Sequence, residues 1–555
     1  MAWVNLEALE VRGILAQRAA LTFARLAGEW YRPHEVFTAD KSGWPGDWEG
    51  RSILATTLMG RATHQTPPWL EEILERVPQH LNAKGYFGKV QPKGVRDEQQ
   101  MSGHSWFLRG LIEYYYWKKD PGIRAMIERI ARNLLVPSLG VYPKYPLTAQ
   151  ERLRTRNWRL SRLQSKTKTH DKSIDTGCAF LAIDGVSQAY ELLRWPKIRE
   201  LLDEMIARFL EMDLVAMKVQ THATLSACRG ILRLYEQDGE REHLAIAQRI
   251  FDLYKRLAWT ENYGNYNWFD RPRWTEVCAI VDSFIVAVWL WRNTGDPQYL
   301  EDAHHIYYNS VEHSHRASGG FGSARCLGTE WVYLEVTTYE VEWCCNMRGG
   351  EVWPKAYEFL FWHEGDTLTL PFYHNATATI PLKGGALKVR TSTTYPYEGK
   401  VRVEVLESAS RAVRTLRLFA PSWTRQAETA VLVNGRRVRT EFDRGFLVLK
   451  MPLKAGDRIE LDLGLSLHVK DTHNQSRYSI KGYHTFRHGP CVLAADFREV
   501  LRLGKDADLR PLGMGRYELR GDEVFSGAVL APISNPHVFT QPLEKRQVLF
   551  KEEPG

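Results

Sequence analysis

Up to about residue 360, the chain alternates between two kinds of segment whose apolar residues recur with a helical period. Amphipathic segments place apolar residues at i, i+3, i+4 and i+7, which is the spacing of one face of an α-helix. They cover residues 68–81, 122–135, 197–212 and 241–257. More uniformly apolar segments lie between them, at 105–117, 183–193, 223–237 and 282–293. The pattern predicts helical hairpins, each with one buried and one half-exposed helix.

Short turn sequences such as KKDPG and NTGDP connect an apolar helix to the amphipathic helix that follows it. Apolar helices inside and amphipathic helices outside suit a closed toroid of hairpins, an (α/α)6 barrel, which carries its active site in the loops at one end. The spacing of the repeats is uneven, so a strict solenoid is not predicted. An open helical array is the alternative, and the pattern favours the barrel.

After residue 365 the period changes from helical to alternating. Short runs of alternating apolar and polar residues, bounded by Gly, Pro or Asn-Gly, predict antiparallel strands and a β-sandwich. A second β-rich part follows from about residue 470. A chain of 555 residues is also too long for one core. We therefore predict a multidomain α + β protein with a helical barrel at 1–362, a β-sandwich at 363–468 and a second β-rich domain at 469–555.

Composition excludes several classes of protein. Hydrophobic residues make up 44% and charged residues 25% of the chain, as in soluble globular proteins. The net charge of +8 is spread along the chain without a basic block that contains aromatic residues, so no nucleic-acid partner is predicted. No apolar run reaches about 18 residues, so no membrane span is predicted. The nearest candidate, 280–291, is typical of a buried helix.

Cysteine and aromatic content point to a location and a ligand. Seven cysteines without a recognisable secretory signal at the N-terminus predict a reducing, cytoplasmic environment. The 19 tryptophans and 24 tyrosines exceed what packing needs, and stacked aromatic faces bind sugar rings, which suggests a small carbohydrate as partner. Symmetric dimers are common among soluble enzymes, so a homodimer is compatible with the sequence.

Two adjacent cysteines, Cys344 and Cys345, stand in the segment VEWCCNMRGGE. A disulfide between them would strain the backbone, because neighbouring Cα atoms are about 3.8 Å apart and a relaxed bridge needs about 5.5 Å. Upstream, the segment TEVCAIVDSF adds Glu276 and Cys278. Three thiolates and one carboxylate complete a tetrahedral shell for Zn²⁺, which soft sulfur ligands favour. The spacing is not that of a zinc finger, so buried free thiols are the alternative.

A metal-bound thiolate is also a nucleophile at neutral pH, and it needs a partner acid. Glu261 lies in a loop rich in aromatic residues and asparagine and is the candidate, with an exposed loop carboxylate as the alternative. His104 and His222 each open an apolar helix, where their ring nitrogens could bind sugar hydroxyls at the mouth of the barrel. A capped helix start is the alternative for both histidines.

The segment GWPGDWEGRS at 43–52 is another loop-like patch that is both aromatic and acidic. Trp48 and Glu49, with the neighbouring Asp47, are candidates for contact with a substrate. A simple turn at the start of a helix explains the same residues equally well.

At these motifs the chain resembles glycoside hydrolase family 127, the β-L-arabinofuranosidase family, and its relatives. GHSWFLRGLIEYYYW and THATLSACRGILRLYEQDGE resemble helices of the family's barrel. TEVCAIVDSF resembles its Glu-x-Cys-Ala box, and CCNMRGG resembles its cysteine pair. VLVNGRRV and GYHTFRHGPCVLAADF resemble strands of its β part. The resemblance covers nearly the whole length of the chain.

The resemblance implies a retaining exo-glycosidase that hydrolyses terminal β-L-arabinofuranosides or a related small glycoside. Cys344 would attack the anomeric carbon. The zinc ligands would be Glu276, Cys278, Cys344 and Cys345. Glu261 would act as general acid and then as general base, in the two-step logic of retaining enzymes. A metal-stabilised thiolate would also be the better leaving group in the second step.

The same resemblance assigns sugar binding to His104 and His222. The chain departs from the family at Asn346-Met347, where a proline is often found, and at Cys178, where a further sugar-binding histidine was expected. The basic segment 152–173 has no counterpart. These departures concern the substrate, so another sugar, acidic ones included, is an open alternative.

Two further classes of function are compatible with the sequence. A lyase or epimerase on the same barrel is one, although such an enzyme would not need three cysteines. A non-catalytic carbohydrate-binding protein with a structural zinc site is the other, because three thiolates and one carboxylate also close a structural site.

Overall fold

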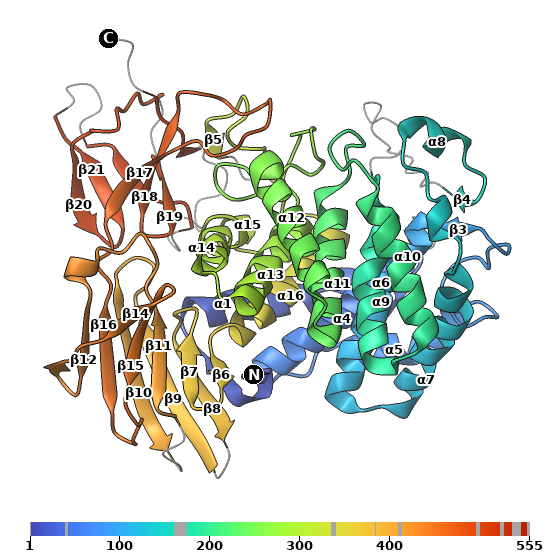
Figure 1. Ribbon diagram of the computed structural model, residues 1–555, viewed down its shortest axis with the longest axis horizontal. Coiled ribbons are helices and arrows are strands. Elements are labelled where there is room, and N and C mark those ends of the chain that lie inside the picture. Colours follow the sequence, from blue (N-terminus) through green and yellow to red (C-terminus); the bar gives the residue numbers. More distant parts are fainter. Residues whose placement is uncertain are drawn as a thin grey trace.

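The computed structural model of the protein describes residues 2–38, 43–159, 175–334, 340–382, 385–408, 413–495, 500–521, 527–534 and 546–551. Helices fill one part of the molecule and β-sheets fill the other, as Figure 1 shows. The sheets are antiparallel except for two short parallel pairings. A helical first part followed by β-sheets is the order predicted from the sequence.

Six inner helices form a closed ring within the described part of the chain. They are α4 (Asp47–Thr63), α6 (Glu98–Lys118), α9 (Ala182–Leu193), α11 (Thr221–Asp238), α13 (Val277–Thr294) and α16 (Met347–Glu358). Each of these helices packs on the next one in this order, and α16 packs back on α4. This is the closed arrangement that the alternating segments predict.

A second helix covers each inner helix from outside. In the same order these helices are α5 (Leu70–His80), α7 (Pro121–Ile130), α10 (Pro196–Leu210), α12 (Arg241–Ala258), α14 (Pro297–Ile306) and α1 (Ile14–Leu26). The outer helices bury one face, whereas α13 is buried along its length from Val277 to Trp291. By length and hydropathy α13 passes as a membrane span, but 83% of it is buried in the protein, as a core helix would be.

Glycines allow the inner helices to approach closely. A Cβ atom on Gly50 of α4 would lie 2.1 Å from the backbone nitrogen of Phe107 on α6. A Cβ atom on Gly230 of α11 would lie 2.6 Å from the carbonyl oxygen of Ile183 on α9. Since real Cβ contacts are essentially never this short, only glycine fits at these two points of the ring.

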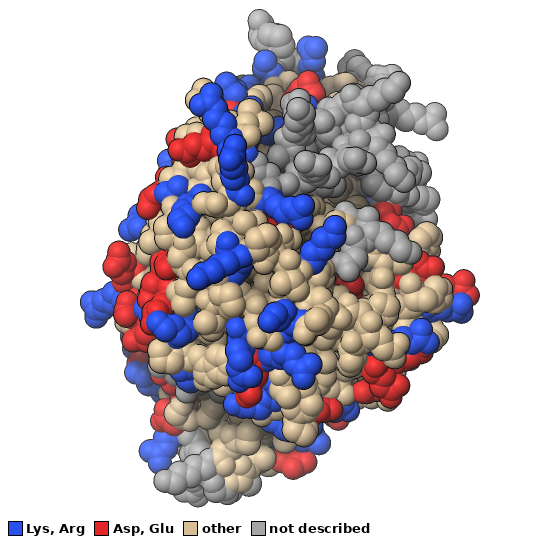
Figure 2. Space-filling view, turned by 90° about the vertical axis from the view of Figure 1, so that its right-hand side faces the viewer, with Lys and Arg blue, Asp and Glu red and all other residues tan. Residues whose placement is uncertain are grey.

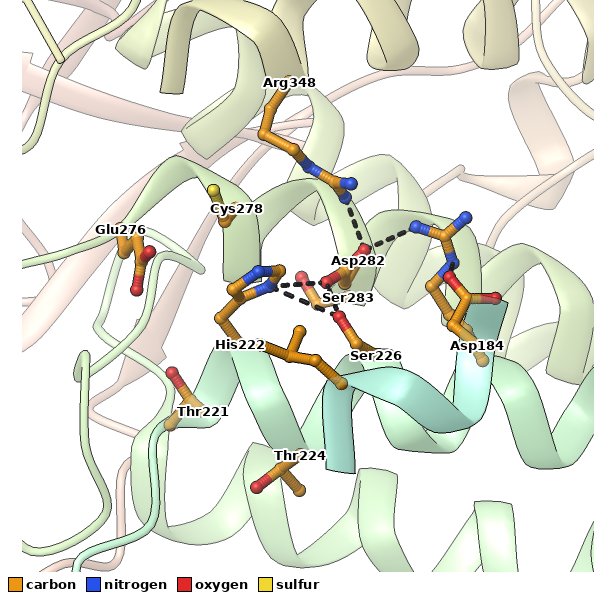
Figure 3. A network of polar contacts seen from close by, with 12 residues as sticks. Asp184, Thr221, His222, Thr224, Ser226, Glu276, Cys278, Asp282, Ser283 and Arg348 are labelled. Carbon is orange, nitrogen blue, oxygen red and sulfur yellow. Dashed lines mark hydrogen bonds and ion pairs between the residues drawn. The ribbon is translucent and has the colours of Figure 1, made fainter. Parts of the chain in front are cut away.

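A buried network of charges fills the centre of the ring. Its members are Arg109, Arg229, Arg348, Asp184, Asp282 and Glu351, each at most 4% exposed. Arg229 pairs with Asp282 at 2.6 Å and with Glu351 at 2.8 Å, so α11 is linked to α13 and α16. Asp282 also pairs with Arg348, as Figure 3 shows, and so lies between two arginines, Arg229 and Arg348. Three cations face three anions, so the buried charge is balanced.

Two sheets form the β part next to the barrel. The first has the order β1 (Ala2–Trp3), β6 (Trp362–Glu364), β7 (Thr367–Leu370), β11 (Thr415–Phe419), β15 (Phe446–Lys450) and β14 (Glu441–Asp443). The second has the order β13 (Arg436–Arg437), β12 (Ala430–Val433), β16 (Arg458–Asp462), β10 (Lys400–Ser408), β9 (Gly385–Thr393), β8 (Ala376–Leu382) and β2 (Leu9–Val11). Residues on the buried faces of both sheets belong to one hydrophobic core.

The third sheet belongs to the C-terminal part. Its order is β17 (Leu467–Asp471), β18 (His484–His488), β19 (Cys491–Ala495), β22 (Val529–Pro532), β21 (Arg516–Leu519) and β20 (Leu509–Gly513). β23 (Arg546–Gln547) joins it to β5 (Tyr333–Leu334), which precedes α16 in the chain. The C-terminal sheet is therefore tied directly to a loop of the helical part.

The predicted domain boundaries stay predictions, but two strands modify the picture of an all-helical N-terminal domain. β1 and β2, within the first 11 residues, pair with β6 and β8 of the sandwich. The predicted boundary at 362/363 also divides β6.

Of the basic segment 152–173, the part from residue 160 onwards lies outside the described residues. Within the described part, Arg152 pairs with Glu98 at 3.0 Å.

The face in Figure 2 is the helical side of the molecule. Lys and Arg side chains are spread over it between uncharged residues, and acidic side chains lie mainly toward its edges. The basic residues on this face thus mark no single continuous patch.

We expect Gly50→Ala to lower the free energy of unfolding by about 1–3 kcal/mol, the usual range for overpacking a core. The added methyl group meets backbone rather than a flexible side chain, so the two helices must separate. Thermal unfolding of the variant beside Arg249→Ala, an exposed change on α12, measures the effect. Equal unfolding midpoints for the two variants would contradict the close packing of α4 on α6.

Candidate functional site

Two helix starts bring three cysteines together at one end of the ring. Cys278 lies in the first turn of α13, and Cys344 and Cys345 lie in the π-helical turn Glu342–Asn346 directly before α16. The three Sγ atoms all lie within 4.8 Å of one another. Cys278 Sγ and Cys344 Sγ are hydrogen-bonded at 2.9 Å. The two motifs, far apart in sequence, thus meet because α13 and α16 are neighbours in the ring.

Glu276 stands beside these thiols, at the N-cap of α13. Its Oε1 atom lies 3.7 Å from Cys344 Sγ. Its backbone N–H donates to Asn265 Oδ1 at 3.0 Å, and Gln220 Nε2 lies 3.4 Å from its Oε2 atom. All four residues predicted as metal ligands therefore meet in one place.

The donor set fits zinc. Bond lengths of about 2.3 Å to sulfur and 2.0–2.2 Å to oxygen place sulfur and oxygen about 3.5 Å apart in a tetrahedral shell, and two sulfurs about 3.8 Å apart. The 3.7 Å between Cys344 and Glu276 agrees with the first value. The hydrogen-bonded thiols of Cys278 and Cys344, at 2.9 Å, would need to separate by less than 1 Å.

The thiols hold their protons tightly when no cation is bound. Burial raises the pKa of Cys278 well above its ordinary value. The hydrogen bond with Cys278 raises the pKa of Cys345. The hydrogen bond from Cys278 lowers the pKa of Cys344, but the contact with Cys345 and burial outweigh it, so its pKa is also raised. A thiolate at Cys344 at neutral pH therefore requires a bound cation.

Asn346 fixes the turn that carries the cysteine pair. Its Nδ2 donates to the Tyr31 hydroxyl at 3.0 Å and to Glu340 Oε2 at 2.8 Å, and its Oδ1 accepts from Phe321 N at 2.5 Å. The departure from proline at this position thus has a structural role. No motif in the sequence indicates these partners, which lie in three separate segments.

Arg51 also contacts the cysteine cluster. It is not among the residues singled out from the sequence, although it stands in the segment GWPGDWEGRS. Its Nη1 lies 3.5 Å from Cys278 Sγ, and its Nε donates to Asp47 Oδ1 at 2.6 Å. Its guanidinium group lies 3.9 Å from the centre of the Trp106 ring. The Asp-x-x-x-Arg spacing at the start of α4 was the signal, because residues i and i+4 share a helix face.

Trp48 lies at the edge of the cysteine cluster and Glu49 does not reach solvent. The Trp48 ring stacks on Trp343, the neighbour of Cys344, with centroids 4.4 Å apart and an interplanar angle of 11°. Both tryptophans are partly exposed. Glu49 is only 2% exposed on α4. Of this predicted pair, Trp48 is therefore the residue that offers surface to a ligand.

His222 points toward the cluster from the start of α11. Its Nδ1 contacts Asp282 Oδ2 at 2.8 Å, and its Nε2 has no partner within the described residues. Asp282 lies one helical turn after Cys278, so both side chains share a face of α13, and Figure 3 shows His222 on that side. With Nδ1 held by Asp282, Nε2 is the atom available to a ligand.

His104 has a structural role instead. Its Nδ1 donates to the carbonyl of Gln100 at 2.8 Å, and its Nε2 accepts from Phe87 N at 3.1 Å. Burial lowers its pKa to about 4, so the ring is neutral and each nitrogen has one partner. These contacts leave no ring nitrogen for a sugar hydroxyl, contrary to the expectation from the sequence.

Glu261 is not the exposed loop carboxylate that was one reading of the sequence. It is 0% exposed and forms an ion pair with His473 Nδ1 at 2.8 Å. It also accepts from the backbone N–H groups of His473 and Asn474 at 3.0–3.1 Å. Burial raises its pKa, but the His473 contacts outweigh this effect, so the pKa lies below its ordinary value. No described contact links Glu261 to the cysteines.

Asp175 is a carboxyl group at the site that the sequence analysis does not single out, although it lies three residues before Cys178. Gln220 Nε2 lies 3.3 Å from Asp175 Oδ1 and 3.4 Å from Glu276 Oε2, so one amide bridges the two carboxyl groups. Burial, and then the charge of Glu276, raise the pKa of Asp175 to about 8. Burial and the charge of Glu276 thus favour the protonated form of Asp175 when no cation is bound.

The comparisons with known proteins agree with this architecture. Residues 367–465 match the sequence family described as β-L-arabinofuranosidase, GH127 middle domain. The solved structure of a glycoside hydrolase superposes with a TM-score of 0.73 at 15% identity, covering 100% of this chain and 98% of its own. That of a GH127 β-arabinofuranosidase has a TM-score of 0.73 at 13% identity, covering 100% and 98%.

A third solved structure, a GH127 β-L-arabinofuranosidase from Geobacillus stearothermophilus T6, has a TM-score of 0.63 at 14% identity and covers 96% of this chain and 94% of its own. At these identities the likeness is one of fold. No curated protein matches the chain in sequence. The resemblance to GH127 is therefore confirmed for the middle domain by sequence and for the whole chain by fold.

We expect the protein to bind about one zinc ion per chain, and Cys278→Ser to lose most of it. Metal content by mass spectrometry measures this, with Cys228→Ser, a buried thiol outside the cluster, as the control. Because the free thiols have raised pKa values, protons compete with the metal, and zinc content should fall as the pH is lowered. Equal zinc content in both variants would contradict the site.

Proposed function

From the fold and the match of residues 367–465, we propose that the protein is a retaining exo-glycosidase that acts on terminal β-L-arabinofuranosides or a closely related small glycoside. The observation that carries the proposal is the meeting of Cys278, Cys344 and Cys345 with Glu276 at the helix starts of the ring. Of these thiols Cys344 is the nucleophile, because it alone is partly exposed.

The first step is displacement at the anomeric carbon. The Cys344 sulfur forms a bond to that carbon while the bond to the leaving oxygen breaks, and an acid transfers a proton to the leaving oxygen. Glu276, Cys278, Cys344 and Cys345 would hold zinc, which when bound supplies the positive charge that keeps the sulfur a thiolate. Arg51, 3.5 Å from Cys278, adds a second positive charge to the sulfur cluster.

The proton donor is Asp175 rather than Glu261 in our proposal. A general acid must carry its proton at the working pH; burial favours the protonated form of Asp175, and Gln220 links this carboxyl group to Glu276 beside the thiols. Glu261 is ionised, covered by His473 and Asn474, and held by three hydrogen-bond donors. Its contacts suit an anchor between the barrel and the C-terminal part better than a proton donor.

The second step is hydrolysis of the glycosyl–cysteine bond. Asp175, now ionised, takes a proton from water, the water oxygen bonds to the anomeric carbon, and the bond from carbon to Cys344 breaks. The sulfur leaves as a thiolate, which restores the starting state. Two displacements at one carbon retain its configuration.

The residues proposed to bind the sugar lie near the cysteine cluster and have either an unpartnered polar atom or an exposed aromatic face. His222 Nε2 is buried and without a described partner, so it accepts or donates one hydrogen bond to a sugar hydroxyl. Trp48 and Trp343 offer the aromatic surface beside Cys344. His104 is left out of this set, because both of its ring nitrogens bond to the backbone.

A cytoplasmic location is part of the proposal. All seven cysteines are free thiols, although Cys278 and Cys344 are close enough to hydrogen-bond. A metal site built from three thiols survives best in a reducing compartment.

We expect Cys344→Ala to reduce the hydrolysis of an aryl β-L-arabinofuranoside by at least about 10³-fold, the usual cost of losing a catalytic nucleophile. Release of the aryl group from zinc-loaded, reduced protein measures the rate, and Cys228→Ala serves as the matched control. A glycosylated peptide containing Cys344, found by mass spectrometry after rapid quenching, would identify the nucleophile directly. Full activity of the Cys344→Ala variant would contradict the proposed mechanism.

We expect Asp175→Asn to slow hydrolysis in proportion to the pKa of the leaving group, with little loss for activated aryl groups, because these need no proton. In the wild type the rate should fall as the pH rises through about 8, since the acid then loses its proton, and the variant should lack this decline. Glu261→Gln is the comparison. If it, and not Asp175→Asn, shows the dependence on leaving group, the proton donor is Glu261.

A further inference from the structure

A cavity of about 650 Å³ lies where the helical part meets both β parts. The end of α12, the outer helix α14, the 422–425 loop of the sandwich and residues 466–487 of the C-terminal part line it. It shares no lining residue with the cysteine cluster, Asp175 or His222. Its size is that of sites for small organic ligands, which occupy about 300–1,000 Å³.

Positive charge in this cavity exceeds negative charge. Lys255 is paired with Asp302, and Arg425 with Glu428 outside the cavity. Glu301 accepts from the backbone N–H and the hydroxyl of Ser422, at 2.6 and 2.8 Å. The remaining cations are Arg256, Lys470 and Arg487, and none has an ion pair with a described residue. Arg256 and Arg487 therefore have no described carboxylate partner in the cavity, whereas the charge of Lys470 also acts on Glu301 and Asp302.

Among these three cations, Arg487 gives the strongest indication of an anionic ligand, because its side chain is only 1% exposed. Its Nε donates to Thr485 Oγ1 at 3.0 Å and its Nη1 to the Tyr263 hydroxyl, both of which are neutral. Its Nη2 has no hydrogen-bond partner within the described residues. A buried guanidinium without a counter-ion costs several kcal/mol, on the order of the effective penalty for a buried ion, unless an anion completes the site.

The cavity also offers rigid aromatic walls and an acceptor for hydroxyl groups. Tyr263 is stacked between His305, at 4.5 Å and 6°, and His473, at 5.1 Å and 22°. Burial lowers the pKa of His305 well below its ordinary value, so the ring is neutral. Its Nδ1 lies 3.0 Å from the carbonyl oxygen of Pro490 and must donate to it, which leaves Nε2 as an acceptor.

We propose that this cavity is a binding site for a sugar that carries a carboxylate, separate from the cysteine cluster. The carboxylate pairs with Arg487, and Arg256 and Lys470, which also line the cavity, add positive charge. The ring hydroxyls reach the neutral acceptor on His305. A hydroxylated anion satisfies both the cationic and the acceptor groups, whereas a neutral sugar leaves the cations unpaired and a simple inorganic anion leaves the acceptor unpaired.

The cavity also borders the anchor of Glu261. His473, which pairs with Glu261, lines the cavity on its other side. A ligand here would contact the barrel, the sandwich and the C-terminal sheet at once, so its binding should raise the unfolding temperature of the full chain.

The test is calorimetric titration of the full-length, zinc-loaded protein with three probes: D-galacturonate, D-galactose and sodium sulfate. We expect galacturonate to bind one site per chain, and at least about 10-fold more tightly than galactose or sulfate, since each of these lacks one of the two contacts. Lys470→Ala and Arg256→Ala, both surface changes, should each weaken binding about 3- to 10-fold and leave aryl-glycoside hydrolysis unchanged.

Three further arms decide between the sites and the ligand classes. Cys344→Ala should bind galacturonate as the wild type does, whereas loss of binding there would place the ligand in the cysteine cluster and overturn the proposal. Arg487→Lys should weaken binding more than either surface change if it folds. Equal binding of sulfate and galacturonate would reduce the cavity to a simple anion site, and undiminished binding by the Arg256→Ala/Lys470→Ala double variant would remove it altogether.

Discussion

The balanced charge network at the centre of the helical ring is the interaction on which the rest of the site depends. Arg229 alone links α11 to α13 and to α16, through Asp282 and Glu351. In a ring closed by close glycine contacts, buried ions cannot move apart to find water, so removing one partner leaves an uncompensated charge and costs about 3–5 kcal/mol. The network therefore fixes the rotation of the helices that begin at the candidate metal ligands and at His222.

One residue, Asp282, connects this charge network to the candidate site at the cysteine cluster. Asp282 takes its charge compensation from Arg229 and Arg348 and offers its second oxygen to His222. One turn earlier on the same helix face stands Cys278, so the positions of this candidate metal ligand and of the His222 ring have one physical cause.

The C-terminal part contributes more than a covering sheet. Its 473–474 backbone holds Glu261 in place, and the residues around it close the cavity that contains Arg487. The two candidate sites differ in chemistry: one is built from thiols and carboxyl groups, the other is lined mainly by cations and aromatic side chains. A chain that ended with the sandwich would lose the second site and the anchor of Glu261.

The order of helices and strands, the four metal-ligand candidates and the resemblance to GH127 could be predicted from the sequence. Helical and alternating periods are local properties, and Glu-x-Cys and Cys-Cys are pairs of rare ligand types at fixed spacing. The partners and burial of His104, Glu261 and Asp175 are visible only in the tertiary structure. Whether a nitrogen is free, or a carboxyl holds its proton, depends on burial and on partners up to 213 positions away, as for Glu261 and Asn474.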